Sequence, residues 1–118
     1  MQRAVIALVF ATLLAGCGSS SDKVAISSAQ ELATAIGCRN FVSMTGDRYA
    51  TESGSCTLGK DVMSVAYFKS PKERTPWQVA HKQVSAFSHI LLGQHFAVSG
   101  PADKLRVAKR KLGGDYLS

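Results

Sequence analysis

The sequence predicts an α+β fold: a small two-layer sandwich with a mostly antiparallel sheet and helices packed on one face. Three observations predict this class. Apolar residues recur at helical spacing in three segments, at 28–36, 75–89 and 102–112. Segment 61–68 is rich in Val, Tyr and Phe on both faces, which is typical of a central strand. Gly59-Lys60, just before it, predicts a two-residue turn, so this strand is expected to pair antiparallel with the preceding one.

The first helix has start and stop signals close together and is expected to be short. One serine of Ser27-Ser28 can cap it, and Glu31 stands three residues after the second serine, as in a capping box. Gly37 is a natural stop. Beyond it, residues 41–44 predict a brief strand. Residues 49–58 predict a strand that is weak until Ser55-Cys56-Thr57-Leu58, because the segment includes Thr, Ser and Gly54.

The second helix has the clearest start in the chain. Thr75 is the expected N-cap, Pro76 the first helical residue, and Gln78 completes a capping box. An apolar stripe follows at helical spacing: Trp77, Ala80, Val84, Phe87 and Leu91. We expect this helix to end near residues 88–89, and residues 90–98 to be extended with an interruption at Gly93.

The first sixteen residues are expected to form a targeting segment, so they are excluded from the predicted fold. Met1-Gln2-Arg3 is a short positive start, and ten mostly apolar residues follow it. A permanent membrane helix needs about 20 apolar residues, so the run suits a signal peptide. Leu14-Ala15-Gly16-Cys17 comes next and resembles the lipobox of bacterial lipoproteins, in which the cysteine is lipidated. An ordinary cleaved signal peptide with a chance cysteine is the alternative.

The lipobox resemblance implies cleavage before Cys17 and attachment to a membrane through lipid on that cysteine. Two or more acyl chains anchor a protein firmly, since each buried methylene contributes about 0.8 kcal/mol. Residues 17–23 are then a flexible Ser-rich linker, and residues 24–118 a single globular domain. The implied location is the extracytoplasmic side of the cell membrane. Gly18 stands where an inner-membrane retention signal has Asp. In a Gram-negative host, the outer membrane is therefore an alternative location.

The rest of the chain resembles small bacterial lipoproteins to which no activity is assigned. Shared features are two cysteines, a strand that ends in Phe, a helix that begins with Trp and a terminal Leu-Gly-Gly; here they are Cys38, Cys56, Phe68, Trp77 and Leu112-Gly113-Gly114. These motifs are structural, and the resemblance implies no catalytic or binding residue.

Cys38 and Cys56 are expected to form a disulfide, because such bonds persist in an oxidising extracytoplasmic compartment. Closing a loop of about 18 residues stabilises a domain by on the order of 3 kcal/mol. Two free thiols or half of a metal site are the alternatives. No CxxC spacing supports metal.

The last helix is expected after Pro101, with Leu105, Ala108 and Leu112 buried and Gly113-Gly114 as its stop. It also carries five cations: Lys104, Arg106, Lys109, Arg110 and Lys111. One interpretation is a solvated face that complements the helix dipole. The other is contact with anionic lipid head groups or an acidic envelope polymer. Without Arg3, thirteen basic residues stand against eight acidic ones, giving a net charge of +5. Nucleic acid is not an expected partner in this compartment.

No catalytic or metal-binding motif stands out in the sequence. His81, His89 and His95 do not form HxxxH or HExxH, and no serine stands in GxSxG. The eight acidic residues are scattered and suggest no acid–base pair. We therefore expect no enzyme activity, no cofactor and no metal.

The function predicted from these observations is a membrane-anchored, extracytoplasmic and non-catalytic interaction module of the cell envelope. Its expected partners are the membrane, through Cys17, and either an envelope protein or an anionic envelope component. The alternative is an extracytoplasmic carrier or sensor of a small ligand or metal, using His89, His95 or a pocket under the second helix.

Overall fold

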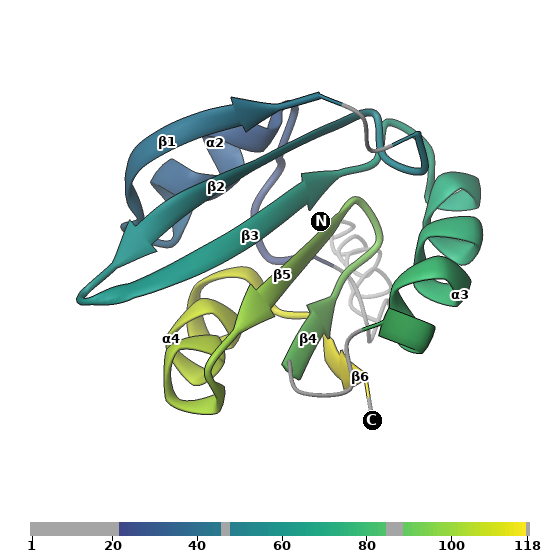
Figure 1. The fold of residues 1–118 in the computed structure, drawn as a ribbon. Coiled ribbons are helices and arrows are strands. Elements are labelled where there is room, and N and C mark those ends of the chain that lie inside the picture. Colours follow the sequence, from purple (N-terminus) through teal and green to yellow (C-terminus); the bar gives the residue numbers. More distant parts are fainter. Residues whose placement is uncertain (1–21, 46–47, 85–88, 118) are drawn as a thin grey trace, which may run out of the picture.

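The computed structural model describes residues 22–45, 48–84 and 89–117, which form three helices and six strands (Figure 1). The predicted α+β class is confirmed. The elements, in chain order, are α2 (Ala29–Ala35), β1 (Arg39–Met44), β2 (Glu52–Leu58), β3 (Asp61–Tyr67), α3 (Arg74–Val84), β4 (His89–Leu92), β5 (Phe96–Gly100), α4 (Ala102–Leu112) and β6 (Asp115–Leu117).

All strands belong to one antiparallel sheet with the order β1-β2-β3-β5-β4-β6. β3 lies between β2 and β5, so the central position that its apolar faces predict is confirmed. Leu58 pairs with Asp61, which leaves a two-residue turn, and Gly59 has a φ of +67° there. A positive φ at the first central residue is what a type II′ turn requires.

α2 begins and ends where the sequence predicts. The Ser28 hydroxyl accepts a hydrogen bond from the backbone N–H of Glu31 at 3.0 Å. The Glu31 carboxylate in turn accepts bonds of 2.9 Å from the backbone N–H and the hydroxyl of Ser27. These bonds satisfy donors that a helix start leaves free. Gly37, with a φ of +79°, follows the last turn.

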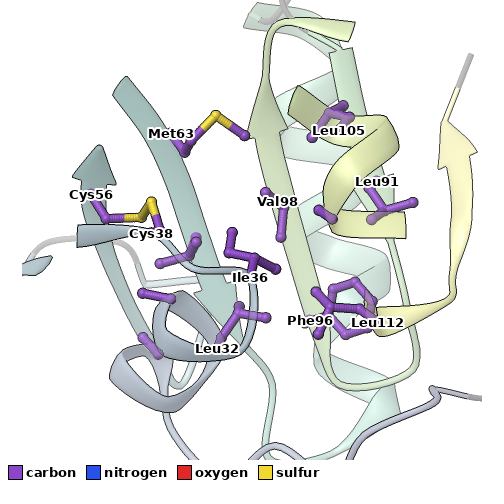
Figure 2. Packing of buried hydrophobic residues seen from close by; sticks show 14 residues of the cluster. Leu32, Ile36, Cys38, Cys56, Met63, Leu91, Phe96, Val98, Leu105 and Leu112 are labelled. Carbon is purple, nitrogen blue, oxygen red and sulfur yellow. A yellow bond between two sulfur atoms is a disulfide. The ribbon is translucent and has the colours of Figure 1, made fainter. Parts of the chain in front are cut away.

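α2 and α4 cover one face of the sheet and enclose the larger part of the core (Figure 2). Side chains alternate between the faces of a strand, so every second residue of the central strands points to this layer. Figure 2 shows Leu32 of α2, Ile36 at its C-cap, and Leu105 and Leu112 of α4 gathered with strand residues. These strand residues are Met63, Leu91, Phe96 and Val98. All eight are fully buried.

A smaller cluster lies on the opposite face of the sheet, toward which the alternate side chains of the strands point. Its residues are Ala66, Phe68, Trp77, Ile90, Leu92 and Ala97. Trp77 is the contribution of α3, which lies away from α2 and α4 in the molecule (Figure 1). The rings of Phe68 and Trp77 meet edge to face, with centroids 5.7 Å apart. The sheet therefore has a fully covered face and a partly covered one.

The predicted start of the second helix is wrong, and its predicted end borders residues 85–88, which lie outside the described residues. A 3₁₀ turn at Pro71–Glu73, capped by the Ser70 hydroxyl, continues directly into α3, so the helix starts at Arg74 and Thr75 is not its N-cap. α3 is described to Val84. Leu91, predicted as the last residue of the helical stripe, lies in β4 and is fully buried against the α4 layer. Phe87 lies outside the described residues.

Candidate functional site

The five cations of α4 do not form a single patch. Leu105, Ala108 and Leu112 are buried, so the cations occupy the remaining sides of the helix. Arg106 and Arg110 stand four residues apart and share one exposed face. The other three lie along α4 in this order: Lys104, Lys109 and Lys111. Their surroundings differ, and the difference decides which of them can bind a partner.

Lys104, near the start of α4, is neutralised by carboxylates. Its Nζ atom lies 3.6 Å from an Asp61 oxygen at the β2–β3 turn and 3.6 Å from an Asp103 oxygen. Such pairs on a protein surface contribute at most about 1 kcal/mol. Their main effect here is on charge, because two carboxylates offset one ammonium group. The sequence prediction placed Lys104 with the anion-binding cations, and the structure separates it from them.

Lys109 is also engaged within the domain. Its ammonium group donates a hydrogen bond to the backbone carbonyl of Gly114, and it lies over the ring of Tyr116, 5.3 Å from the centroid. It is half-buried, whereas Arg110 and Lys111 are exposed. Arg110 and Lys111 are thus the cations at the end of α4 that remain open to an external anion.

The start of the described chain is fixed beside the end of α4. The backbone N–H of Lys23 donates to the carbonyl of Leu112 at 2.7 Å, and its Nζ atom donates to the carbonyl of Arg110 at 3.3 Å. Asp22 forms a β-bridge with Gly113. Lys23 is exposed, so it adds a third cation to Arg110 and Lys111. Sequence reasoning assigned Lys23 to a linker and missed it, since nothing local signals a contact 87 residues away.

Asp22 closes the connection between β4 and β5. Its two carboxylate oxygens accept hydrogen bonds from the backbone N–H groups of Gln94, at 2.8 Å, and His95, at 3.1 Å. The Arg74 guanidinium donates to the carbonyl of Gly93 in the same connection, at 2.8 Å. The beginning of the domain, α3 and the β4–β5 connection are therefore tied together.

Cys38 and Cys56 form the predicted disulfide, with Cα atoms 5.6 Å apart (Figure 2). The bond joins the segment after α2 to β2. Both residues belong to the larger core cluster and are buried. A disulfide leaves neither sulfur as a thiolate for metal binding or nucleophilic attack. Cys17, the predicted lipidation site, lies outside the described residues.

The histidines are not brought together as a pair. His95 lies in the β4–β5 connection, and its Nδ1 atom is 2.9 Å from the Phe68 carbonyl oxygen. His89 is exposed on β4 and lines a hollow of about 200 Å³ with Arg106 and Tyr116. His81 lies in α3, and its side chain is outside the described residues. Within the described part of the chain, no three His, Cys, Asp or Glu side chains are placed to hold a metal ion.

Two larger hollows open on the surface. One, of about 440 Å³, is lined by Asp22, Val24, Ala25, Ile26, Tyr67, Gln94 and His95. The other, of about 460 Å³, lies beside β1 and the start of β2 and is lined mostly by polar residues. Both exceed the lower limit of about 300 Å³ for small-molecule sites. The pocket predicted under the second helix corresponds to a smaller hollow, of about 110 Å³, which lies beside Trp77 of α3 and is also lined by Met44, Ser64 and Ser99.

The partly covered face of the sheet exposes apolar side chains on β1 and β3. Val62 is 70% exposed and Val42 59% exposed. Val42 pairs with Ser55, and Ser55 with Ser64, so small polar residues separate the two valines across the sheet. The apolar area is therefore interrupted and does not form one continuous patch.

No family model matches the chain, and no curated protein or solved structure is significantly similar to it. Among the described residues, none of the helices combines the length and apolar character needed to cross a membrane.

Proposed function

We propose that the chain is a lipid-anchored, non-catalytic interaction module on the extracytoplasmic side of the cell envelope. The observation that carries the proposal is the Cys38–Cys56 disulfide in a chain that also has the lipobox-like Leu14-Ala15-Gly16-Cys17. Stable disulfides are typical of exported proteins, and the lipobox resemblance independently implies export. The two features therefore support the same compartment.

The surface features of the described residues favour binding as the activity. Exposed cations gather at the end of α4, and exposed valines lie on the open face of the sheet. The chain after Cys17 has a net charge of +5, which favours anionic components of the envelope as partners. Arg106, Arg110 and Lys111 are expected to contribute most, because they are exposed, whereas Lys104 and Lys109 already have partners within the domain.

The anchor is tested by Cys17→Ser in the full chain, expressed in a bacterial host that processes lipoproteins. Without the thiol there is no group to accept diacylglycerol, so we expect incorporation of labelled palmitate to be lost. Wild-type protein grown in parallel is expected to be labelled and to fractionate with membranes. Continued labelling of the variant would contradict the anchor, and so would an unlabelled wild-type protein.

The interaction is tested by photo-crosslinking in intact cells. Photoreactive residues placed at Arg106 and at Val62 sample the outer side of α4 and the open face of the sheet. At least one position is expected to give a discrete product, and Cys17→Ser in the same background is expected to abolish it. A smear of products that is unchanged by loss of the anchor would argue against a specific envelope partner.

A second candidate, a carrier of a small ligand, is favoured by the 440 Å³ hollow at His95. The hollow combines apolar side chains with the polar groups of Asp22, Tyr67 and Gln94, a mixture found in ligand sites. A carrier is expected to show a rise in Tm with a specific metal or metabolite. If a broad panel of such compounds leaves Tm unchanged, this candidate is rejected.

A further inference from the structure

The exposed cations next to the start of the domain define one surface. Lys23, Arg110 and Lys111, here called the basic end, are all exposed, and Lys23 is bonded directly to the last turn of α4. Within residues 22–45, 48–84 and 89–117, none of the three forms an ion pair. The Asp22 carboxylate beside them is occupied by two backbone N–H groups.

The opposite end of α4 has a different electrostatic character. There Lys104 lies between Asp61 and Asp103, so its charge is offset. α4 has eleven residues, and a helix rises about 1.5 Å per residue, so the two ends are about 16 Å apart. The positive charge of the helix is therefore concentrated at the end where the chain enters the domain.

The distance from the lipid site restricts which surface faces the membrane. Cys17 and Asp22 are five residues apart in the sequence. A fully extended chain covers at most about 3.6 Å per residue, so Asp22 is held within about 18 Å of the lipidated residue. Because Asp22 is bridged to Gly113, the end of α4 is held near the membrane with it.

We propose that Lys23, Arg110 and Lys111 form the surface with which the anchored domain rests on an anionic phospholipid leaflet. The inference depends on the proposed lipid anchor and adds the orientation and the lipid class. Near an anionic leaflet, each cation strengthens the contact by about fivefold, and salt screens the effect. In this orientation the β2–β3 turn with Lys60, near the other end of α4, is directed away from the bilayer.

The test uses mature lipoprotein purified from membranes, with its lipid verified by intact mass. The protein is reconstituted into vesicles of phosphatidylcholine alone or with phosphatidylglycerol, and its lysines are labelled with an amine-reactive reagent that does not cross membranes. Mass spectrometry then reads each site. We expect Lys23 and Lys111 to be labelled several-fold more slowly in the anionic vesicles, and Lys60 to be labelled equally in both.

Charge reversal supplies the matched comparison. Arg110→Glu with Lys111→Glu is expected to abolish the protection of Lys23 in anionic vesicles. Arg48→Glu with Lys60→Glu changes the net charge by the same amount at exposed positions away from the basic end and is expected to leave that protection intact. High salt is expected to remove the protection from the wild-type protein. Circular dichroism verifies that both variants fold, and the wild-type labelling pattern tests the proposal without any substitution.

The outcomes separate this inference from the anchor itself. A wild-type protein without lipid mass on Cys17 contradicts the proposed function. If Lys23 and Lys111 are labelled equally in both vesicle types, in protein that does carry lipid, the proposal that the basic end contacts the membrane is wrong. An acidic protein partner would then be the better explanation for these cations. Protection of Lys60 in place of Lys23 overturns the orientation.

Discussion

At the scale of single residues, Asp22 has a larger structural role than its place after a run of serines indicates. Its carboxylate accepts the backbone N–H groups of Gln94 and His95, and its backbone bridges to Gly113. A carboxylate that accepts two N–H bonds stabilises a turn more strongly than a neutral acceptor does. Asp22 and Lys23, which the sequence assigned to a flexible linker, are therefore bonded to the body of the domain.

Asp22→Ala is expected to lower the free energy of unfolding by about 1–3 kcal/mol, because two half-buried N–H groups lose their acceptor. Asp22→Asn keeps one acceptor oxygen and is expected to lose less. Urea denaturation measures both. Asp115→Ala, at an exposed position of β6, is the control and is expected to change stability by no more than about 0.5 kcal/mol. Equal stabilities of Asp22→Ala and the control would contradict the role assigned to Asp22.

At the scale of elements, the weakly predicted strand β2 depends on a glycine. An added Cβ at Gly54 would stand 2.4 Å from the ring of Phe41 and 2.6 Å from the carbonyl oxygen of Val42. Both atoms belong to β1, the neighbouring edge strand. Glycine lowers strand propensity, and here it allows the Phe41 ring to lie across β2.

Gly54→Ala is therefore expected to destabilise the domain by about 1–3 kcal/mol, although alanine is the less flexible residue. Ser55→Ala, at the next position and half-buried, serves as the control and is expected to have a smaller effect. Chemical denaturation followed by circular dichroism compares them. A Gly54→Ala protein as stable as wild type would show that β1 can shift to accommodate the methyl group.

Elements with local signals could be predicted from the sequence, and elements determined by distant contacts could not. α2 has its cap and its stop within ten residues, α4 has its glycine stop, and β3 has apolar residues on both faces. β6 has three residues and is a strand because Leu117 pairs with Ile90. Likewise, α3 starts at Arg74 because a 3₁₀ turn precedes it directly. The sequence did not predict this turn, since Thr75-Pro76 is the stronger helix-start signal.

The candidate site also has features that could be predicted from the sequence and features that depend on distant contacts. Composition located the cations of α4, but the sequence could not separate Lys104 from Lys111, because Asp61 reaches Lys104 from a turn far away in the chain. Lys23 joined the site only through a contact with the end of α4. Charge can be counted in a sequence, whereas its neutralisation depends on the fold.

At the scale of the whole molecule, the disulfide adds a covalent link beside the β1–β2 pairing, where Arg39 already pairs with Thr57. Cys38 follows α2, and Cys56 lies in β2, 18 residues further along the chain. The described residues form a core of modest size, and small domains are stable by roughly 5–15 kcal/mol. One cross-link is therefore a large fraction of the total.

Cys38→Ala with Cys56→Ala is expected to lower the free energy of unfolding by about 3 kcal/mol, mainly because the unfolded chain gains freedom when the loop is opened. Urea denaturation with and without reductant measures this in one experiment. Reductant is expected to shift the wild-type midpoint toward that of the double variant and to leave the variant unchanged. The wild-type protein is compared with and without reductant because the double substitution removes two buried sulfur atoms, and so changes the packing as well as the cross-link. If the double variant is destabilised but reductant does not change the wild-type midpoint, the loss of stability comes from packing. The disulfide would then contribute little to the stability of the domain.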